Sequence, residues 1–223
     1  MKHITIMLAD DHTIVREGFR KMLEMEPDFE IVGEAQNGRL AVAQALKLRP
    51  QVVLMDIAMP LLNGLEAARQ VLKALPATKV LMLSAHSDDA YVKNAAESGA
   101  SGFLLKQTSA HEVCRAIREI HAGKTFFSPA ISKRMDHQKS MDRSGGTRKD
   151  ADHLTSREME VLQLIAEGKA NKETAAELGI GIKTVEKHRE HLMEKLNIHD
   201  TAGLTRYAIG AGIIESSVQL TII

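Results

Sequence analysis

Three carboxylates stand where apolar runs of this sequence end. Asp10 and Asp11 follow the run ITIMLA, and Asp56 ends the run VVLMD (residues 52–56). Negative charges at the end of a buried strand repel each other and are costly to desolvate. Such a position therefore indicates a bound cation or another function that needs the charge. Mg²⁺ prefers a few carboxylate oxygens and keeps several of its waters. These three acids therefore predict a magnesium site.

Two further polar groups end apolar runs in the same half of the chain. Ser84 closes KVLMLS with a hydroxyl, and Lys106 closes SGFLLK with an ammonium. A carboxylate can act as a nucleophile toward phosphorus while a metal neutralises charge and an ammonium holds a phosphoryl oxygen. Each residue alone is more commonly a loop residue, a helix cap or a solvated charge. Their joint occurrence at strand ends favours a phosphoryl-transfer site.

An alternation of strands and helices is predicted to bring these groups together. Short apolar runs predict strands at residues 4–9, 30–35, 52–56, 79–84 and 101–106. Amphipathic segments predict helices at about 13–26, 38–48, 64–74, 88–98 and 110–121. This pattern is typical of an α/β fold with a doubly wound, five-stranded parallel sheet covered on both faces. In the flavodoxin-like strand order 2-1-3-4-5, the strands that end in the acids are neighbours at the switch point.

The second half of the chain has a different pattern. Residues 132–152 are polar and charged and include Gly145 and Gly146, which is typical of a linker. From Leu154 onward every apolar pattern has helical spacing. We predict a phosphoacceptor domain at 1–124, a linker at 125–152 and an all-α domain of four helices at 153–223.

Local signals place those four helices. Thr155 and Glu158 form a predicted capping box, Asn171 is a predicted N-cap, and Gly181 opens the third helix. A fourth helix is predicted at about 200–210. Two short helices joined by LGIG, the second rich in cations, indicate a helix-turn-helix.

Composition limits the function classes only weakly. The chain has 223 residues, formal charge zero and a single cysteine, Cys114, which excludes an internal disulfide. Residues 153–223 carry eight Lys/Arg against ten Asp/Glu, so net charge does not identify a DNA-binding domain. No apolar run approaches the ~18 residues of a membrane span. We expect a cytoplasmic protein with no membrane partner.

The segments LADDH, VVLMDIAMPLLNG, MLSA and GFLLK resemble the receiver domain of two-component response regulators. The resemblance implies that Asp56 accepts a phosphoryl group from a histidine kinase. It implies a Mg²⁺ site formed by Asp10, Asp11, Asp56 and the backbone carbonyl of Ala58. It further implies that Ser84, Phe103 and Lys106 sense the phosphoryl group, with Phe103 turning inward, and that His86 tunes its lifetime.

The segment from Leu154 to about residue 210 resembles the LuxR-type helix-turn-helix of NarL/FixJ-family regulators, with departures at Ser156, Thr174 and Gly181. The resemblance implies that helix 182–196 enters the major groove of promoter DNA. Base edges would be met by Lys187, Glu186 and His191, and phosphates by Lys183, Thr184, His188 and Lys195. It also implies a homodimer on activation, with Ala202, Leu204, Ala208 and Ile209 at its surface.

We therefore expect a phosphorylation-controlled transcriptional regulator that is not an enzyme. One alternative is a DNA-binding regulator that is independent of phosphate and has a vestigial acidic site. Another is an aspartyl-phosphate phosphatase of the haloacid-dehalogenase type. That class usually carries a second acid two residues after its nucleophile, where this chain has Ala58.

Overall fold

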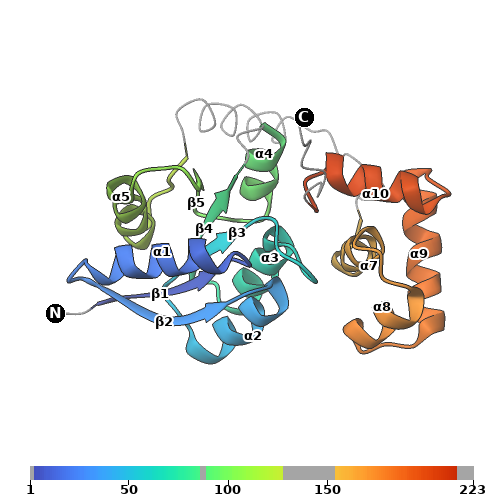
Figure 1. The fold of residues 1–223 in the computed structure, drawn as a ribbon, viewed down its shortest axis with the longest axis horizontal. Helices are drawn as coiled ribbons and strands as arrows, with labels where there is room; N and C mark the ends of the chain where they lie inside the picture. Colours follow the sequence, from blue (N-terminus) through green and yellow to red (C-terminus); the bar gives the residue numbers. More distant parts are fainter. Residues whose placement is uncertain (1–2, 86–88, 128–153, 215–223) are drawn as a thin grey trace. The chain divides into compact units, whose positions relative to one another are not determined.

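The structure, a computed structural model, describes residues 3–85, 89–127 and 154–214 (Figure 1). The chain divides into two compact units, residues 1–147 and 148–223, which we describe separately. The predicted domain boundaries at 124 and 153 stay predictions, because most of the segment between them lies outside the described residues. Across those residues, no helix is long and apolar enough to cross a membrane.

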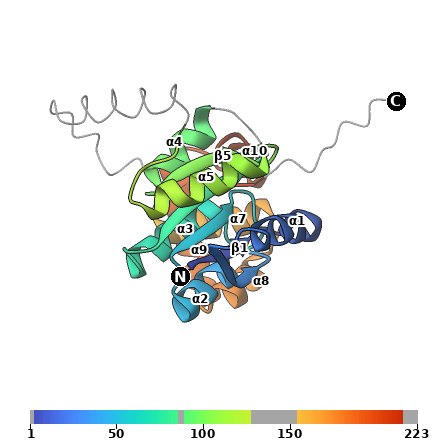
Figure 2. The same cartoon turned by 90° about the vertical axis from the view of Figure 1, so that its left-hand side faces the viewer.

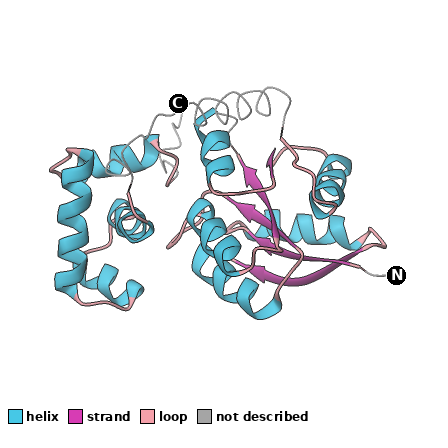
Figure 3. Cartoon of the chain, turned by 180° about the vertical axis from the view of Figure 1, so that it is seen from behind, coloured by secondary structure: helices cyan, strands magenta, loops and turns pink. Residues whose placement is uncertain are grey.

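The first unit is built on the predicted five-stranded parallel sheet, with strand order β2-β1-β3-β4-β5. Figure 3 shows the strands of this sheet lying between helices. Its strands are β1 (Ile4–Ala9), β2 (Phe29–Ala35), β3 (Val52–Asp56), β4 (Lys79–Ser84) and β5 (Gly102–Leu105). The central strands β1, β3 and β4 are almost entirely buried. Such strands read as continuous apolar runs because both faces of the sheet are covered.

Five helices cover the two faces of this sheet (Figure 2). They are α1 (Thr13–Glu24), α2 (Gly38–Leu48), α3 (Gly64–Ala74), α4 (Asp89–Glu97) and α5 (Ala110–His121). One apolar core joins a face of the sheet to α2, α3 and α4, and a second core joins the other face to α1 and α5. The doubly wound prediction is confirmed, with helix ends shifted by at most two residues.

Residues just after α5 complete the edge of the sheet beside β5. The Phe103 amide donates to the Phe126 carbonyl at 3.0 Å, and the Phe126 amide donates to the Ser101 carbonyl at 2.9 Å. Phe126 packs against the core under α1 and α5, whereas Phe127 packs against the opposite core. The predicted linker therefore begins with residues that belong to this sheet edge, because the partly buried side chains of Phe126 and Phe127 pack against its two cores.

The second unit contains the four predicted helices. They are α7 (Ser156–Ala166), α8 (Asn171–Leu178), α9 (Ile182–Leu196) and α10 (Thr201–Gly210). The capping box that opens α7 is confirmed, since the Thr155 amide donates to the Glu158 carboxylate at 2.8 Å and the Thr155 hydroxyl accepts from the Glu158 amide at 3.3 Å.

One cap prediction in this unit is wrong. The N-cap of α8 is Ala170, one residue before the predicted Asn171. Alanine offers no side-chain acceptor, but the Glu173 carboxylate accepts the Ala170 amide at 2.8 Å and satisfies that free donor. Gly181 is the N-cap of α9 as predicted, without a side-chain bond.

Candidate functional site

The carboxyl ends of β1 and β3 place two acids at the same edge of the sheet. Because Ala9 of β1 pairs with Met55 of β3, Asp10 and Asp56 leave the sheet side by side. Both are buried, with 3% and 1% of their surface exposed. The ammonium of Lys106, just after β5, lies 3.0 Å from Asp10 Oδ2 and 2.9 Å from Asp56 Oδ2. The structure thus joins two predicted acids and the predicted lysine.

Asp11 and His12 extend this acidic group into the loop between β1 and α1. The His12 ring nitrogen Nδ1 lies 2.9 Å from Asp11 Oδ1 and 3.3 Å from Asp10 Oδ1, and the His12 amide donates to Asp10 Oδ1 at 2.9 Å. Ligand atoms of Asp10, Asp11, His12 and Asp56 all lie within 4.8 Å of one another. His12 was not predicted from the sequence as a site residue, although its position directly after the acid pair was a signal.

The oxygens of this site fit a divalent cation. Asp10 Oδ2 and Asp56 Oδ2 face the Lys106 ammonium, and Asp11 Oδ1 faces the His12 ring. Buried carboxylates are destabilising unless positive charge compensates them, and one ammonium cannot balance three carboxylates. Oxygen-rich sites of this kind hold hard ions such as Mg²⁺.

Burial and like charges shift the protonation of the site. Burial raises the pKa of Asp56 to about 7; Lys106 opposes this increase, and the negative charges of Asp10 and Asp11 add to it. Burial by itself would lower the pKa of Lys106, but the attraction of Asp56 raises it above its ordinary value. Lys106 therefore stays charged, while Asp56 needs further positive charge to be fully ionised at neutral pH.

The loop after β3 is tied closely beneath Asp56. A Cβ atom at Gly64 would lie 1.8 Å from the Asp56 carbonyl oxygen, so only glycine fits there. The Gly64 amide donates to the Ile57 carbonyl at 2.7 Å, and the Asn63 side chain caps α3 by accepting the Glu66 amide at 2.9 Å. Ala58 lies within this fixed loop, and its carbonyl as a metal ligand stays a prediction.

The two other predicted sensing residues lie on the neighbouring strands. Ser84 ends β4 with 2% of its surface exposed and pairs in register with Leu105 of β5. Phe103, 6% exposed, packs into the core under α2, α3 and α4. The Phe103 ring therefore already lies inward in this structure, and its turn on phosphorylation stays a prediction. His86 lies outside the described residues.

In the second unit, α9 has one buried side and one exposed side. Val185 and Leu192 are fully buried against the other helices. The predicted contact residues Lys183, Thr184, Glu186, Lys187 and His191 are exposed, and His188 is half-buried. Exposure of most of the predicted set leaves this surface open to a partner such as DNA.

Lys195 does not share that exposed surface. Its ammonium lies 2.7 Å from Glu158 Oε2, a carboxylate whose side chain is 5% exposed. Burial opposes ionisation of Glu158, but the hydrogen bond from Lys195 and the bonds from Thr155 hold its pKa below the ordinary value. Lys195 therefore ties α9 to the start of α7, which argues against its predicted contact with a DNA phosphate.

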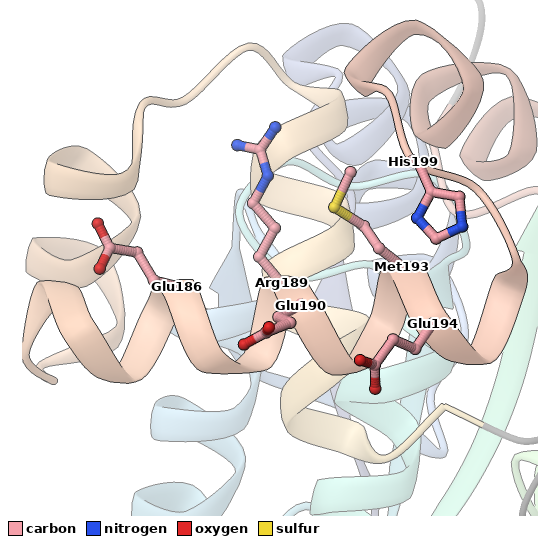
Figure 4. A pocket seen from close by; sticks show the side chains of 6 residues that line it. All are labelled: Glu186, Arg189, Glu190, Met193, Glu194 and His199. Carbon is pink, nitrogen blue, oxygen red and sulfur yellow. The ribbon is translucent and has the colours of Figure 1, made fainter.

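An acidic hollow lies along α9 (Figure 4). It has a volume of about 360 Å³ and is lined by Glu186, Arg189, Glu190, Met193, Glu194 and His199. Of these residues only Glu186 was predicted from the sequence to contact DNA, yet Glu190 and Glu194 follow it at intervals of about one helical turn. Its three carboxylates make this side of α9 unsuitable for binding a DNA phosphate. The cationic side of the helix is the neighbouring one, which carries Lys187 and His191.

The predicted dimer surface on α10 is partly wrong. Leu204 and Ala208 are fully buried in the core of the second unit. Ala202, Tyr207 and Ile209 are exposed. The apolar residues of this helix fall on two sides, and only the outer side is available to a second chain.

Comparisons with known proteins agree with this geometry. The model of the response regulator receiver domain matches residues 6–118, and that of bacterial regulatory proteins of the luxR family matches residues 152–208. The transcriptional regulatory protein DegU of Brevibacillus brevis is 37% identical, with 88% of this chain and 89% of DegU covered. The response regulator protein VraR of Staphylococcus aureus is 36% identical, with 95% of this chain and 99% of VraR covered.

Among solved structures, the RcsB response regulator of Salmonella typhimurium, studied for its conformational dynamism in DNA interaction, is 28% identical with a TM-score of 0.54. That match covers 93% of this chain and 98% of RcsB. The acidic edge with its lysine, the helix-turn-helix and these relatives lead to one conclusion. The chain belongs to the NarL/FixJ family of response regulators, in which a receiver domain precedes a LuxR-type helix-turn-helix domain.

Proposed function

We propose that Asp56 accepts a phosphoryl group from a histidine kinase, and that this event controls binding of α9 to promoter DNA. The observation that carries the proposal is the meeting of Asp10, Asp56 and Lys106 at one sheet edge, with an ammonium 2.9–3.0 Å from both carboxylates. Mg²⁺ would be held by Asp10, Asp11, Asp56 and the carbonyl of Ala58, and it would supply charge neutralisation for the carboxylates and the phosphoryl oxygens.

The residues of the chain divide the chemistry between them. A carboxylate oxygen of Asp56 attacks phosphorus, and the bond from phosphorus to the kinase imidazole breaks in line with it. The leaving imidazole keeps the electron pair and takes up a proton. Lys106 turns from the carboxylates to a phosphoryl oxygen, and the Ser84 hydroxyl donates to another.

A phosphoryl group carries a charge of roughly −1.5 to −2, but it replaces the single negative charge of the attacking Asp56 carboxylate, so the edge gains about one negative charge. A nearly complete switch between two states needs a preference of about 5.5 kcal/mol, which one phosphoryl site can supply only in part. Partial DNA binding without phosphate is therefore expected. We infer that the added charge displaces β5 and the surface of α4 and α5, and that this change of surface controls the binding of α9 to DNA.

For the second unit, the exposed cationic flank of α9 supports major-groove binding. Recognition helices of this type contact base edges with their N-terminal residues, which here include Lys187. Dimers joined through the outer side of α10 would read half-sites about one duplex turn, roughly 34 Å, apart. The Lys187→Glu variant should lose operator binding, and the Lys172→Glu variant on α8 should lose much less. Operator binding by Lys187→Glu as tight as that of the wild type would refute this placement.

Mass spectrometry tests the first half of the proposal. After incubation with acetyl phosphate and Mg²⁺, the wild-type chain should gain one phosphoryl group, and Asp56→Asn should gain none. The Asp200→Asn variant, at the cap of α10, serves as the matched control and should behave as wild type. A gel shift with and without the phosphoryl donor tests whether phosphorylation controls DNA binding. Equal affinity and oligomeric state in both conditions would instead support the phosphate-independent alternative.

A further inference from the structure

Arg16 connects the acid pair to the neighbouring strand. Its Nη1 donates to the carbonyl oxygen of Asp10 at 2.7 Å, and its Nε donates to Glu34 Oε2 at 2.8 Å. The side chain is 12% exposed, so these bonds are largely shielded from water. Glu34, in β2, also accepts a hydrogen bond from Arg20 of α1. One guanidinium thus joins the backbone of the acid loop to a strand that carries no metal ligand.

The Asp10 carbonyl, which accepts the bond from Arg16, is the first backbone group of the loop after β1. The Asp10 amide still pairs with the Ala35 carbonyl at 3.1 Å. The Asp10 carbonyl belongs to the next peptide unit, the one that joins Asp10 to Asp11. Because a peptide is planar, fixing its carbonyl also fixes the direction in which the chain continues. The orientation of this peptide decides where the Asp11 side chain begins.

We propose that Arg16 is a positioning residue for the cation site, which holds the Asp10–Asp11 peptide so that both carboxylates face the same point. The inference rests on the proposed function, since it concerns the Mg²⁺ of the phosphoryl-transfer site. Arg16 bonds to the backbone carbonyl of Asp10 and to Glu34, and not to a carboxylate oxygen proposed to bind the ion. Groups that orient metal ligands in this way typically change metal affinity by about 10–100-fold when they are removed.

Charge and positioning predict opposite effects for Arg16. A guanidinium near a cation site repels the cation, so neutralising it would tighten Mg²⁺ binding if charge alone mattered. If Arg16 acts by positioning, the same change weakens binding. Lysine keeps the charge but lacks the planar fork that reaches two partners in fixed directions. The sign of the change in affinity therefore separates the two explanations.

The experiment measures Mg²⁺ binding to the full chain by isothermal titration calorimetry in wild type, Arg16→Gln and Arg16→Lys. Both variants should raise the Kd for Mg²⁺ about tenfold or more. The rate of phosphorylation by acetyl phosphate, followed against Mg²⁺ concentration, should need more Mg²⁺ for half its maximum but approach the wild-type maximum. A merely structural role would not give this split between metal requirement and maximal rate.

Arg118 offers a matched control. In α5 it bridges Glu26 and Asp28 with contacts of 2.6–2.8 Å, and these bonds do not involve Asp10 or Asp11. Arg118→Gln and Arg118→Lys should leave the Kd for Mg²⁺ unchanged. A second variant, Glu34→Gln, keeps Arg16 but weakens its support, and should raise the Kd by a smaller factor. It keeps the inference testable if Arg16→Gln does not fold.

The inference is overturned if Arg16→Gln binds Mg²⁺ as tightly as wild type or more tightly. It is also overturned if the Arg118 variants lose as much affinity as the Arg16 variants. A wild-type chain that binds no Mg²⁺ and gains no phosphoryl group on Asp56 would instead overturn the proposed function, and this inference with it.

Discussion

Replacing Asp56 with asparagine should stabilise the receiver unit at neutral and alkaline pH. The folded pKa of Asp56 is about 7, raised by burial from 3.8. The folded state then holds the proton more tightly than the unfolded state, so stability falls as pH rises from about 4 to about 7. A shift of about three units corresponds to roughly 4 kcal/mol above pH 7 and about 2 kcal/mol at pH 5. Asparagine keeps the volume of the side chain and removes the ionisation.

The assay is urea unfolding of the full chain in EDTA at pH 5 and pH 8. Because the chain has no tryptophan, unfolding is followed by circular dichroism, and hydrogen exchange of the β3 amides reports the receiver unit separately. We expect Asp56→Asn to exceed wild type by up to about 4 kcal/mol at pH 8 and by roughly half as much at pH 5. Mg²⁺ at a hundredfold excess over its Kd should stabilise wild type by about 2.7 kcal/mol and the variant by less.

Asp28 provides a control of opposite sign. The hydrogen bond from Arg118 holds the pKa of Asp28 below its ordinary value. This carboxylate therefore stabilises the fold above its unfolded pKa, and that stability is lost as pH falls through the lower, folded pKa. Asp28→Asn should be slightly less stable than wild type at pH 8. If Asp56→Asn shows the same pH dependence as wild type, or is less stable at pH 8, the assignment of a buried, reluctantly ionised Asp56 is wrong.

Three further predictions concern packing. Thr174→Val should stabilise the helical unit by about 1 kcal/mol, because the buried Thr174 hydroxyl has no hydrogen-bond partner. As a control, Thr78→Val should destabilise the receiver unit by about 1 kcal/mol, because the Thr78 hydroxyl donates to a backbone carbonyl at 2.8 Å. Thermal unfolding measures both changes. Gly64→Ala should destabilise the receiver and slow phosphorylation by acetyl phosphate, since its Cβ would lie 1.8 Å from the Asp56 carbonyl oxygen. Lys195→Met should lower the melting temperature of the helical unit by leaving Glu158 buried and unpaired, yet change operator affinity little per folded molecule in a gel shift.

The sequence was sufficient for the sheet and for most of the site because topology leaves little choice there. Continuous apolar runs between amphipathic segments can bury themselves only as parallel strands between two helical layers. Once the order β2-β1-β3-β4-β5 is set, the ends of β1 and β3 are neighbours, and Asp10 and Asp56 must meet. Lys106 follows from the same reasoning, since a long side chain from the end of β5 reaches across the edge of the sheet.

Side-chain roles on the helices could not be predicted in the same way. Apolar spacing marks α10 as amphipathic, but which side faces the core depends on helices that are distant in the sequence. Leu204 and Ala208 therefore proved to be core residues, and Ile209 remained outside. Lys195 was similar, since its spacing matches that of the α9 cations but its partner, Glu158, comes from α7. Arg16 carried no sequence signal, because its bond to a backbone carbonyl depends on the path of the loop.

In the proposed mechanism, β5 connects an event at Asp56 with the residues just after α5. Lys106 follows β5 directly, and Phe103 lies three residues earlier on the same strand. The Phe103 amide holds the carbonyl of Phe126, at the start of the segment that leads toward the helical unit. In the proposed mechanism Lys106 leaves Asp10 for a phosphoryl oxygen, and a displacement of β5 would act on Phe126 through the backbone hydrogen bonds that join it to Phe103 and Ser101. Phe103→Leu separates the role of the aromatic ring from that of the backbone bond, because it removes the ring but keeps the amide donor, which proline would remove. The amide of residue 103 should therefore stay protected in hydrogen exchange, whatever the effect of this variant on the response to phosphate.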